Sequence, residues 1–309
     1  MKKMKILTAG FLAAAMVMGL TSCGSTSTDS ASSDATSVDT STVTSEVTTE
    51  ASEAATTEAA ATEVASTESA EVVTIKEGVL MVGVEVGYPP MEYFAEDGST
   101  MTGFDIEMAK AIAEKMGLEV EFVDTAWDGI FAGVDADKYD CIISSVSITD
   151  ERIEAFNMSD PYVANRQVLV VPQDSEITSI DTLSGHSVAV QAETTADNYM
   201  RENQETLGVT DLYEYDKILN CFDDLKSGRA DSVLVDSVVA AYYLGEDASD
   251  YKTVWENDDV EPLGICMKKG NDALLTEMNK IIAELMQDGT LDTISTTYFG
   301  DNSNVKAVQ

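Results

Sequence analysis

Short apolar runs alternate with segments of helical period between residues 79 and 287, and no other feature of the chain constrains its fold as strongly. Val79–Val84 has the length and composition of a buried strand, whereas Asp105–Met116 places its apolar residues on one helical face and ends before Gly117. Strands that alternate with helices predict α/β layers with largely parallel sheets. Ligands of such folds bind beyond the strand ends, where loops lead into helix N-termini.

The same pattern predicts the remaining elements of the chain. Strands are expected at 118–123, 141–146, 167–171, 187–191, 212–215, 232–235 and 263–267. Helices are expected at 127–134, directly after Thr149, and at 194–207, 217–226, 236–244 and 273–287. These elements form two runs that are separated near Pro161, which indicates two lobes.

The N-terminus has the features of a targeting segment. Lys2, Lys3 and Lys5 precede the apolar run Ile6–Leu20, which is too short for a comfortable membrane span. The run leads through small residues to Cys23, a position that resembles the bacterial lipobox, whose Cys is lipidated and becomes the mature N-terminus. We therefore expect residues 1–22 to be a lipoprotein signal peptide, with an ordinary secretory signal and a chance Cys as the alternative.

Residues 23–71 are expected to be the lipidated Cys followed by a disordered tether. From Ser25 to Ala70 the chain consists of Ser, Thr, Ala, Asp and Glu with a few Val, and it contains no aromatic, Leu, Ile, Lys or Arg residue. Such a segment cannot bury enough apolar area to offset its ordering entropy. Because two or more acyl chains hold a protein stably at a membrane, we expect an anchored protein and not a spanning one.

The remaining chain is strongly acidic. The whole sequence has 18 basic and 56 acidic residues, of which three lysines lie in the signal segment and ten acidic residues in the tether. The globular part therefore has 15 basic and 46 acidic residues, a net charge of −31. This charge argues against nucleic acid or anionic lipid headgroups as partners of the domain, and it is typical of a solvated acidic surface.

Three cysteines remain in the globular part of the chain, so at most one disulfide can form there, and whether any two of Cys141, Cys221 and Cys266 pair stays open. Cys141 and Cys266 lie in apolar runs, where Cys serves as a small hydrophobic residue. No paired Cys or His spacing indicates a metal site, and the single histidine, His186, lies beside Gly185 in an expected turn. We expect no metal and no cofactor.

An ordered set of motifs covers nearly all of the globular chain and resembles the family-3 periplasmic solute-binding proteins, the polar amino-acid receptors of ABC importers. The first half matches in the runs at 88–93, 103–109, 127–131, 140–152 and 156–162, and the second half matches in the runs at 185–195 and 228–236. The resemblance implies a type II periplasmic-binding-protein fold, with two α/β lobes and two hinge crossings near 163–167 and 258–263. Residues 72–164 and 263–301 would form lobe 1, residues 165–262 lobe 2, and residues 302–309 a C-terminal tail.

The resemblance also implies which residues bind the two charged groups of an amino acid. Arg152 corresponds to the arginine that binds the α-carboxylate, and its planar guanidinium suits two carboxylate oxygens. Asp236 corresponds to the partner of the α-ammonium group. Further contacts with these groups are implied for Ser145, Ser147, Thr194 and Thr195. From the residues alone, Arg152 could instead pair with Asp150 or Glu151, and Asp236 could be a helix cap.

Four more positions correspond to the surroundings of the ligand's side chain. Tyr88 and Trp127 match aromatic walls, Glu85 falls where relatives that bind cationic or amide side chains often carry an acid, and Gln191 lines the second lobe. We therefore expect a cationic amino acid such as arginine or lysine, with glutamine, histidine or cystine as alternatives. Glu85 could instead point away and pair with a neighbouring Lys or Arg. Glu193 stands where the family often has Gly, which leaves the side-chain specificity open.

The resemblance implies a monomeric, lipid-anchored protein on the extracytoplasmic face of the bacterial cell membrane that delivers a polar L-amino acid to the permease of an ABC importer. A receptor of the same fold that senses the solute is the alternative function. A dehydratase-like enzyme on this scaffold would need a catalytic acid, for which only Glu85 and Glu193 are candidates, and no nucleophile–base pair supports it.

Overall fold

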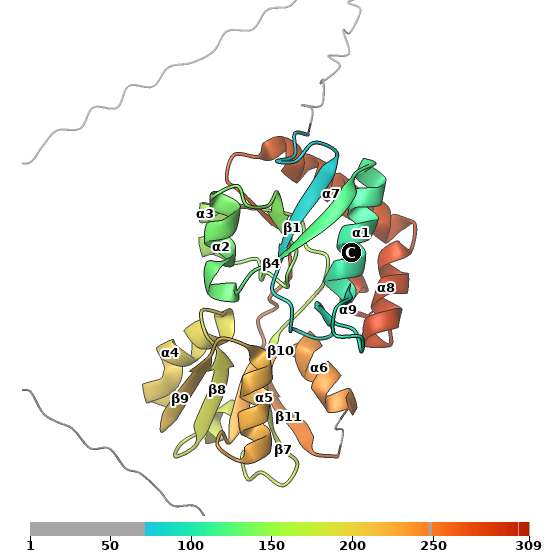
Figure 1. The fold of residues 1–309 in the computed structure, drawn as a ribbon. Helices are drawn as coiled ribbons and strands as arrows, with labels where there is room; N and C mark the ends of the chain where they lie inside the picture. Colours follow the sequence, from blue (N-terminus) through green and yellow to red (C-terminus); the bar gives the residue numbers. More distant parts are fainter. Residues whose placement is uncertain (1–71, 247–248, 302, 309) are drawn as a thin grey trace, which may run out of the picture. The chain divides into compact units, whose positions relative to one another are not determined.

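The computed structural model describes residues 72–246, 249–301 and 303–308, all of which lie in one structural unit (Figure 1). The expected signal peptide, Cys23 and the tether lie outside these residues. Within the described part of the chain, no helix is long and apolar enough to cross a membrane.

The first sheet brings together both ends of the described chain. Its strand order is β4 (Glu119–Asp124), β1 (Val79–Val84), β5 (Cys141–Ile142), β12 (Cys266–Met267) and β6 (Asn157–Met158). Leu80, Val82 and Val84 pack on α1 (Phe104–Met116), whereas Met81 points to the opposite face and packs in the cluster of α2 (Trp127–Asp135). The helices α7 (Asp272–Gln287) and α8 (Thr290–Phe299) contact α1.

Four short elements complete this first lobe. They are the antiparallel pair β2 (Tyr93–Phe94) and β3 (Met101–Thr102), the helix α3 (Asp150–Ala155), and the terminal helix α9 (Ser303–Lys306), which packs on α8.

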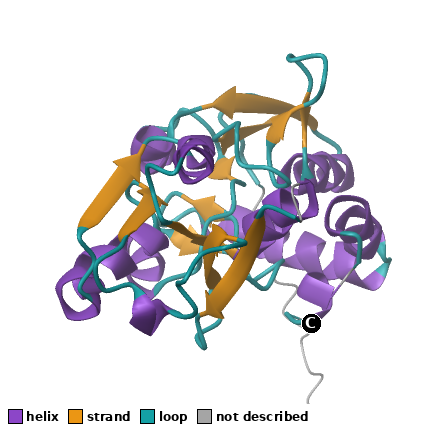
Figure 2. Ribbon diagram, turned by 90° about the horizontal axis from the view of Figure 1, so that it is seen from below, coloured by secondary structure: helices purple, strands orange, loops and turns teal. Residues whose placement is uncertain are grey.

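The second sheet has the strand order β11 (Tyr251–Glu256), β7 (Gln167–Pro172), β10 (Ser232–Asp236), β8 (Ser187–Gln191) and β9 (Asp211–Tyr215). One face is covered by α4 (Thr195–Leu207) and the short helix η1 (Ile180–Thr182). The other face is covered by α5 (Ile218–Ser227) and α6 (Ser237–Glu246). Viewed from below, helices lie on both sides of the central strands (Figure 2).

Two antiparallel crossings join the lobes, so the prediction of two α/β lobes with two crossings is confirmed. The crossing segments are hydrogen-bonded to each other, since Leu263 N donates to Val163 O at 2.9 Å and Glu261 N donates to Asn165 O at 2.8 Å. A paired two-stranded connection permits bending about one axis and resists most other motions, as a hinge requires.

The expectation of largely parallel sheets holds for four of the five strands in each sheet and is wrong for one, β12 in the first sheet and β7 in the second. The strands β4, β1 and β5 run parallel, as do β9, β8 and β10, but β12 is antiparallel to β5 and β7 is antiparallel to β10. The reason lies in the crossings. The parallel strands end at the cleft between the lobes, whereas β7 and β12 directly follow a crossing and therefore begin at the cleft and run away from it.

Several elements differ in length from the prediction. The strand predicted at 141–146 ends at Ile142, because Ser145 has a φ of 50° and turns the chain out of the ladder. The strand predicted at 263–267 is reduced to Cys266–Met267, and Leu263 forms only isolated bridges to Ser147 and Val163. The three cysteines of the described chain are buried and unpaired.

Candidate functional site

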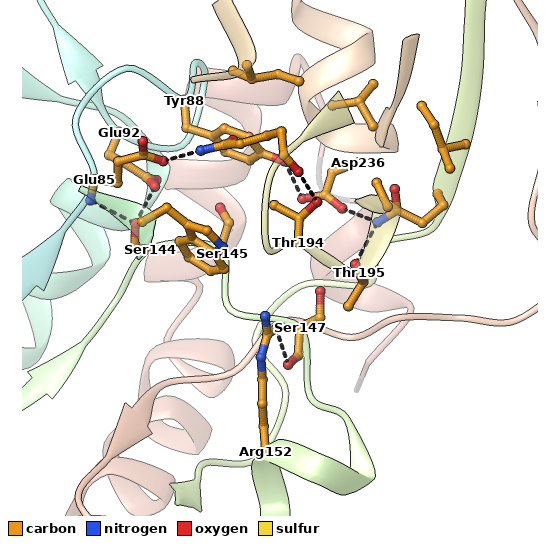
Figure 3. A pocket seen from close by; sticks show the side chains of 17 residues that line it. Glu85, Tyr88, Glu92, Ser144, Ser145, Ser147, Arg152, Thr194, Thr195 and Asp236 are labelled. Atoms are coloured by element: carbon orange, nitrogen blue, oxygen red, sulfur yellow. Dashed lines mark hydrogen bonds between the residues drawn. The ribbon is translucent and has the colours of Figure 1, made fainter. Parts of the chain in front are cut away.

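All ten residues expected at a binding site line a single pocket between the lobes, which encloses about 450 Å³ not filled by protein atoms, part of it open to solvent (Figure 3). They follow the carboxyl ends of the parallel strands: Glu85 and Tyr88 come after β1, Ser145 and Ser147 after β5, and Gln191 and Asp236 end β8 and β10. The parallel topology of the strands therefore gathers side chains that lie up to 151 positions apart.

Arg152 projects from α3 into this pocket and forms no ion pair with a carboxylate of the described residues. Its Nη1 donates to Ser147 O at 2.9 Å, and its guanidinium lies 5.5 Å from the ring centroid of Trp127 and 4.9 Å from that of Phe131. Among the described residues no ion pair joins Arg152 to Asp150 or Glu151. Burial lowers the pKa of Arg152, because the charged form is desolvated.

Asp236 is buried at the other side of the pocket and is held by neutral donors. Its Oδ2 accepts from the Tyr88 hydroxyl at 2.6 Å, and its Oδ1 accepts from Asn165 Nδ2 and Gln167 Nε2, each at 2.7 Å. Burial raises the pKa of Asp236 to about 6, against these hydrogen bonds. No described Lys or Arg forms an ion pair with it.

Glu85 faces the pocket from the end of β1, and no Lys or Arg of the described chain forms an ion pair with it. Its Oε2 accepts from Gln191 Nε2 of the second lobe at 2.7 Å, and its Oε1 is buried without a partner among the described residues. Burial raises the pKa of Glu85 to about 7, and the nearby charge of Lys217 only partly opposes this effect.

Two aromatic residues of the first lobe reach across to the second. The Tyr88 hydroxyl donates to Asp236, and Trp127 Nε1 donates to the carbonyl oxygen of Glu193 at 3.0 Å. Glu193 has a φ of 61°, which is unusual for a residue with a side chain, and its N–H donates to Asp197 Oδ2 at 2.8 Å. Together with the contact between Gln191 and Glu85, these bonds connect the lobes across the pocket.

The hydroxyl residues lie at backbone turns of the pocket. Ser145 and Ser147 are buried in the loop after β5, and Ser145 N donates to Asp105 Oδ2 at 2.7 Å. Thr194 caps α4 by accepting from Asp197 N, and Thr195 Oγ1 donates to Glu261 Oε2 at 2.8 Å. The first turn of α4, with its exposed N–H groups, therefore faces the pocket.

Three polar residues of the pocket were not expected from the sequence: Glu92, Ser144 and Gln167. Glu92 lies inside the matched run at 88–93, so its position in the motif could have pointed to it. Ser144 lies next to a predicted contact residue. Gln167 reaches the site only because β7 pairs with β10 in a register that places it opposite Asp236.

Comparison with known proteins identifies the family of the chain. Residues 80–301 match the sequence profile of the bacterial extracellular solute-binding proteins, family 3. The chain is 34% identical over 229 residues to the L-cystine-binding protein TcyJ of Escherichia coli strain K12, which covers 73% of this chain and 85% of that protein.

Solved structures of similar sequence have the same fold. An ancestral arginine-binding protein bound to arginine is 38% identical and superposes with a TM-score of 0.68 over 72% of this chain and 99% of that one. A substrate-binding protein of an ABC uptake transporter from Streptococcus pneumoniae with bound histidine is 29% identical, with a TM-score of 0.70 over 74% and 94% of the two chains.

Proposed function

The chain belongs to the bacterial extracellular solute-binding proteins, family 3, and on this premise we propose that its interlobe pocket binds a polar L-amino acid for delivery to an ABC importer. The observation that carries the proposal is the pair Arg152 and Asp236. These two residues of opposite charge line one pocket from different lobes, and neither has an oppositely charged partner among the described ion pairs. A zwitterion that lies between them would match both desolvated charges.

The carboxylate end of the ligand is assigned to Arg152. One guanidinium N–H is used by Ser147 O, which leaves further donors for two carboxylate oxygens, and the rings of Trp127 and Phe131 limit the orientation of the guanidinium plane. The N-terminal turn of α4 at Thr194 and Thr195 adds donors that favour an anion.

The ammonium end is assigned to Asp236 together with Gln167. Gln167 donates its amide N–H to Asp236, so its Oε1 is oriented as an acceptor, and this oxygen is buried without a partner among the described residues. An ammonium group would supply the donor that Gln167 Oε1 lacks and the positive charge that Asp236 lacks.

The side chain of the ligand is assigned to the space between Tyr88, Trp127 and Glu85. The unpartnered Oε1 of Glu85 supports a ligand with a donor at its end, either a cationic group, as in arginine and lysine, or an amide or imidazole. An acidic side chain would meet like charge. The two similar structures that contain arginine and histidine support this class of ligand.

The transport role and the anchoring are further parts of the proposal. We assign residues 72–164 and 263–301 to lobe 1, residues 165–262 to lobe 2 and residues 302–309 to a tail, and we infer hinge closure about the crossings near 163–167 and 258–263. The relatives named above are binding proteins, which supports binding without catalysis, and the family is extracytoplasmic. Lipidation at Cys23 would hold the protein at the membrane, where it meets the permease.

Titration calorimetry with the standard amino acids and with cystine, beginning with arginine, lysine and cystine, tests the proposal. We expect at least one polar L-amino acid to bind, and Arg152→Ala to weaken its binding by more than tenfold, since removal of one partner of a buried charge pair costs about 2–5 kcal/mol. Arg229→Ala is the matched control, because Arg229 is exposed and pairs with Asp224 of α5, and neither residue lines the pocket. Unchanged affinity in folded Arg152→Ala would overturn the assignment.

A further inference from the structure

Two buried carboxyl groups meet beneath the loop that leads from β1 to β2. Glu92 is 1% exposed and Asp105 is fully buried in the first turn of α1. The helix begins directly against the loop, since Phe104 N donates to Pro90 O at 3.0 Å and Asp105 N donates to Met91 O at 2.9 Å. This close approach needs Gly103, which has a φ of 129° and whose added Cβ would lie 2.1 Å from the carbonyl oxygen of Met91.

The hydrogen bonds of the four carboxyl oxygens leave two of them without a donor. Glu92 Oε1 accepts from Ser144 Oγ at 2.6 Å, and Asp105 Oδ2 accepts from Ser145 N at 2.7 Å and from the Tyr162 hydroxyl at 3.1 Å. Glu92 Oε2 and Asp105 Oδ1 are buried and have no hydrogen-bond partner among the described residues. The two carboxyl groups are close neighbours, since each of them alters the pKa of the other. Two ionised carboxylates offer only acceptors, so such a contact requires a proton.

We propose that Glu92 and Asp105 share one proton, held on Glu92, and that this acid pair positions the Ser144–Ser145 turn at the ligand pocket. The second part rests on the proposed function, because it assumes that Ser145 contacts the ligand. The proton belongs on Glu92 because Asp105 receives donors from a backbone N–H and a tyrosine, which favour its ionised form, whereas Glu92 receives a single hydroxyl.

The electrostatic surroundings agree with this assignment. Burial raises the pKa of both carboxyl groups. The other titratable groups that face the pair are Glu85 and Tyr88 beside Glu92 and Tyr162 beside Asp105, and none of them brings a positive charge. Burial also raises the pKa of both tyrosines, so they remain neutral donors.

The pair is connected to the pocket through two serines. Glu85 N donates to Ser144 Oγ at 3.0 Å, and Ser144 Oγ donates to Glu92, as the labelled side chains in Figure 3 show. Ser145 has a left-handed backbone with a φ of 50°, a conformation that is costly for a residue with a side chain. Asp105 stabilises it by accepting its N–H. Loss of the acid pair should therefore release the loop that carries Ser145 and Ser147.

The shared proton is tested first on the ligand-free protein by urea unfolding between pH 5 and pH 8. A carboxyl group whose pKa is raised by folding stabilises the folded state most at low pH, and this stability is lost as the pH rises. At pH values between the pKa of Glu92 in the unfolded state and its pKa in the folded state, the equilibrium constant for unfolding of the wild type should increase with pH by up to a further factor of ten per pH unit compared with that of Glu92→Gln. Glu107→Gln, which removes a surface carboxylate from the same helix, should leave the slope unchanged. Equal slopes for wild type and Glu92→Gln would overturn the proposal.

A double-mutant cycle gives a second test. Glu92→Gln can donate its amide to Asp105 and accept from Ser144, and Asp105→Asn can donate its amide to Glu92 and accept from Ser145. In the double variant the amide oxygens at positions 92 and 105 would both accept from the serines, so that the two amide NH2 groups must face each other. If the two substitutions acted independently, their effects on the equilibrium constant for unfolding would multiply. We expect the constant of the double variant to be at least tenfold larger than this product. An additive cycle would contradict a shared proton.

The role of Glu92 in positioning the Ser144–Ser145 turn is tested by ligand affinity. With any amino acid that the wild type binds, Glu92→Ala should weaken binding by at least tenfold, and Glu92→Gln should restore it to within about fivefold of the wild type. Equal affinities of Glu92→Ala and wild type would end the positioning role. If no amino acid binds the wild type, the proposed function fails, while the unfolding slopes and the cycle still decide whether the proton is shared.

Discussion

Gln191 Nε2 donates a 2.7 Å hydrogen bond to Glu85 Oε2, and this bond joins a residue at the end of β8 in the second lobe to a residue after β1 in the first. Both side chains are buried, and the other oxygen of Glu85 has no partner among the described residues. The second lobe therefore supplies a donor to one oxygen of this buried carboxyl group, and the other oxygen is available to a ligand.

Glu85→Gln should weaken the binding of arginine or lysine by more than tenfold and change the binding of glutamine by less than about threefold. The reason is that a cationic group pairs with a carboxylate, whereas an amide can use the carbonyl oxygen of Gln as well. Calorimetry on both proteins with both kinds of ligand measures the difference. Tight binding of glutamate or aspartate by the wild type would show that Glu85 does not select the side chain.

The affinity for the ammonium group should depend on pH through Asp236. Its pKa of about 6 in the ligand-free protein means that it becomes protonated as the pH falls through 6, and the neutral form cannot pair with an ammonium group. In a Glu85→Gln background, affinity for glutamine should fall by up to tenfold per pH unit below 6 and be constant above 7. Asp236→Asn should bind weakly with no such pH dependence. A flat profile in the protein that retains Asp236 would contradict its role.

Glu193→Gly should stabilise the ligand-free protein by about 1 kcal/mol, because a left-handed backbone is costly for Glu and not for Gly. The melting temperature should rise by about 2–4 °C. The carbonyl oxygen that accepts from Trp127 is retained, so the contact between the lobes is kept. Glu202→Gly in the interior of α4 is the control, and it should lower stability by about the same amount. A lower melting temperature for Glu193→Gly would show that its side chain has a stabilising contact.

Cys23→Ala should move the protein from the membrane fraction to the soluble extract or the medium, because the expected acyl chains cannot be attached. Cell fractionation with Ser22→Ala as the control measures this. Mass analysis of the mature protein should find a lipidated Cys23 at its N-terminus. An unlipidated mature N-terminus at another residue would refute the lipoprotein hypothesis.

Local pattern was sufficient to predict most of the helices and the strands that lie inside the sheets. The strand Val79–Val84 has the expected bounds, and α3 begins directly after Thr149 as expected, because apolar periodicity and capping side chains act over a few neighbouring residues. The edge strand β11 and the helix α8 were not predicted. The segment of α8 is rich in Thr and Ser, and it is helical because it packs against α1 and α7, which buries Leu291 and Ser295.

The sequence by itself determined the two α/β lobes and the residue types that surround the site, because strand and helix periods and the ordered motifs are properties of the chain. Only the tertiary structure decided which side chains meet. Gln167 lies beside Asp236 through strand register, and Glu92 lies beside Asp105 because Gly103 lets α1 begin against the loop. Contacts between distant residues depend on how lobes and strands pack in three dimensions, and no local pattern of the sequence contains that information.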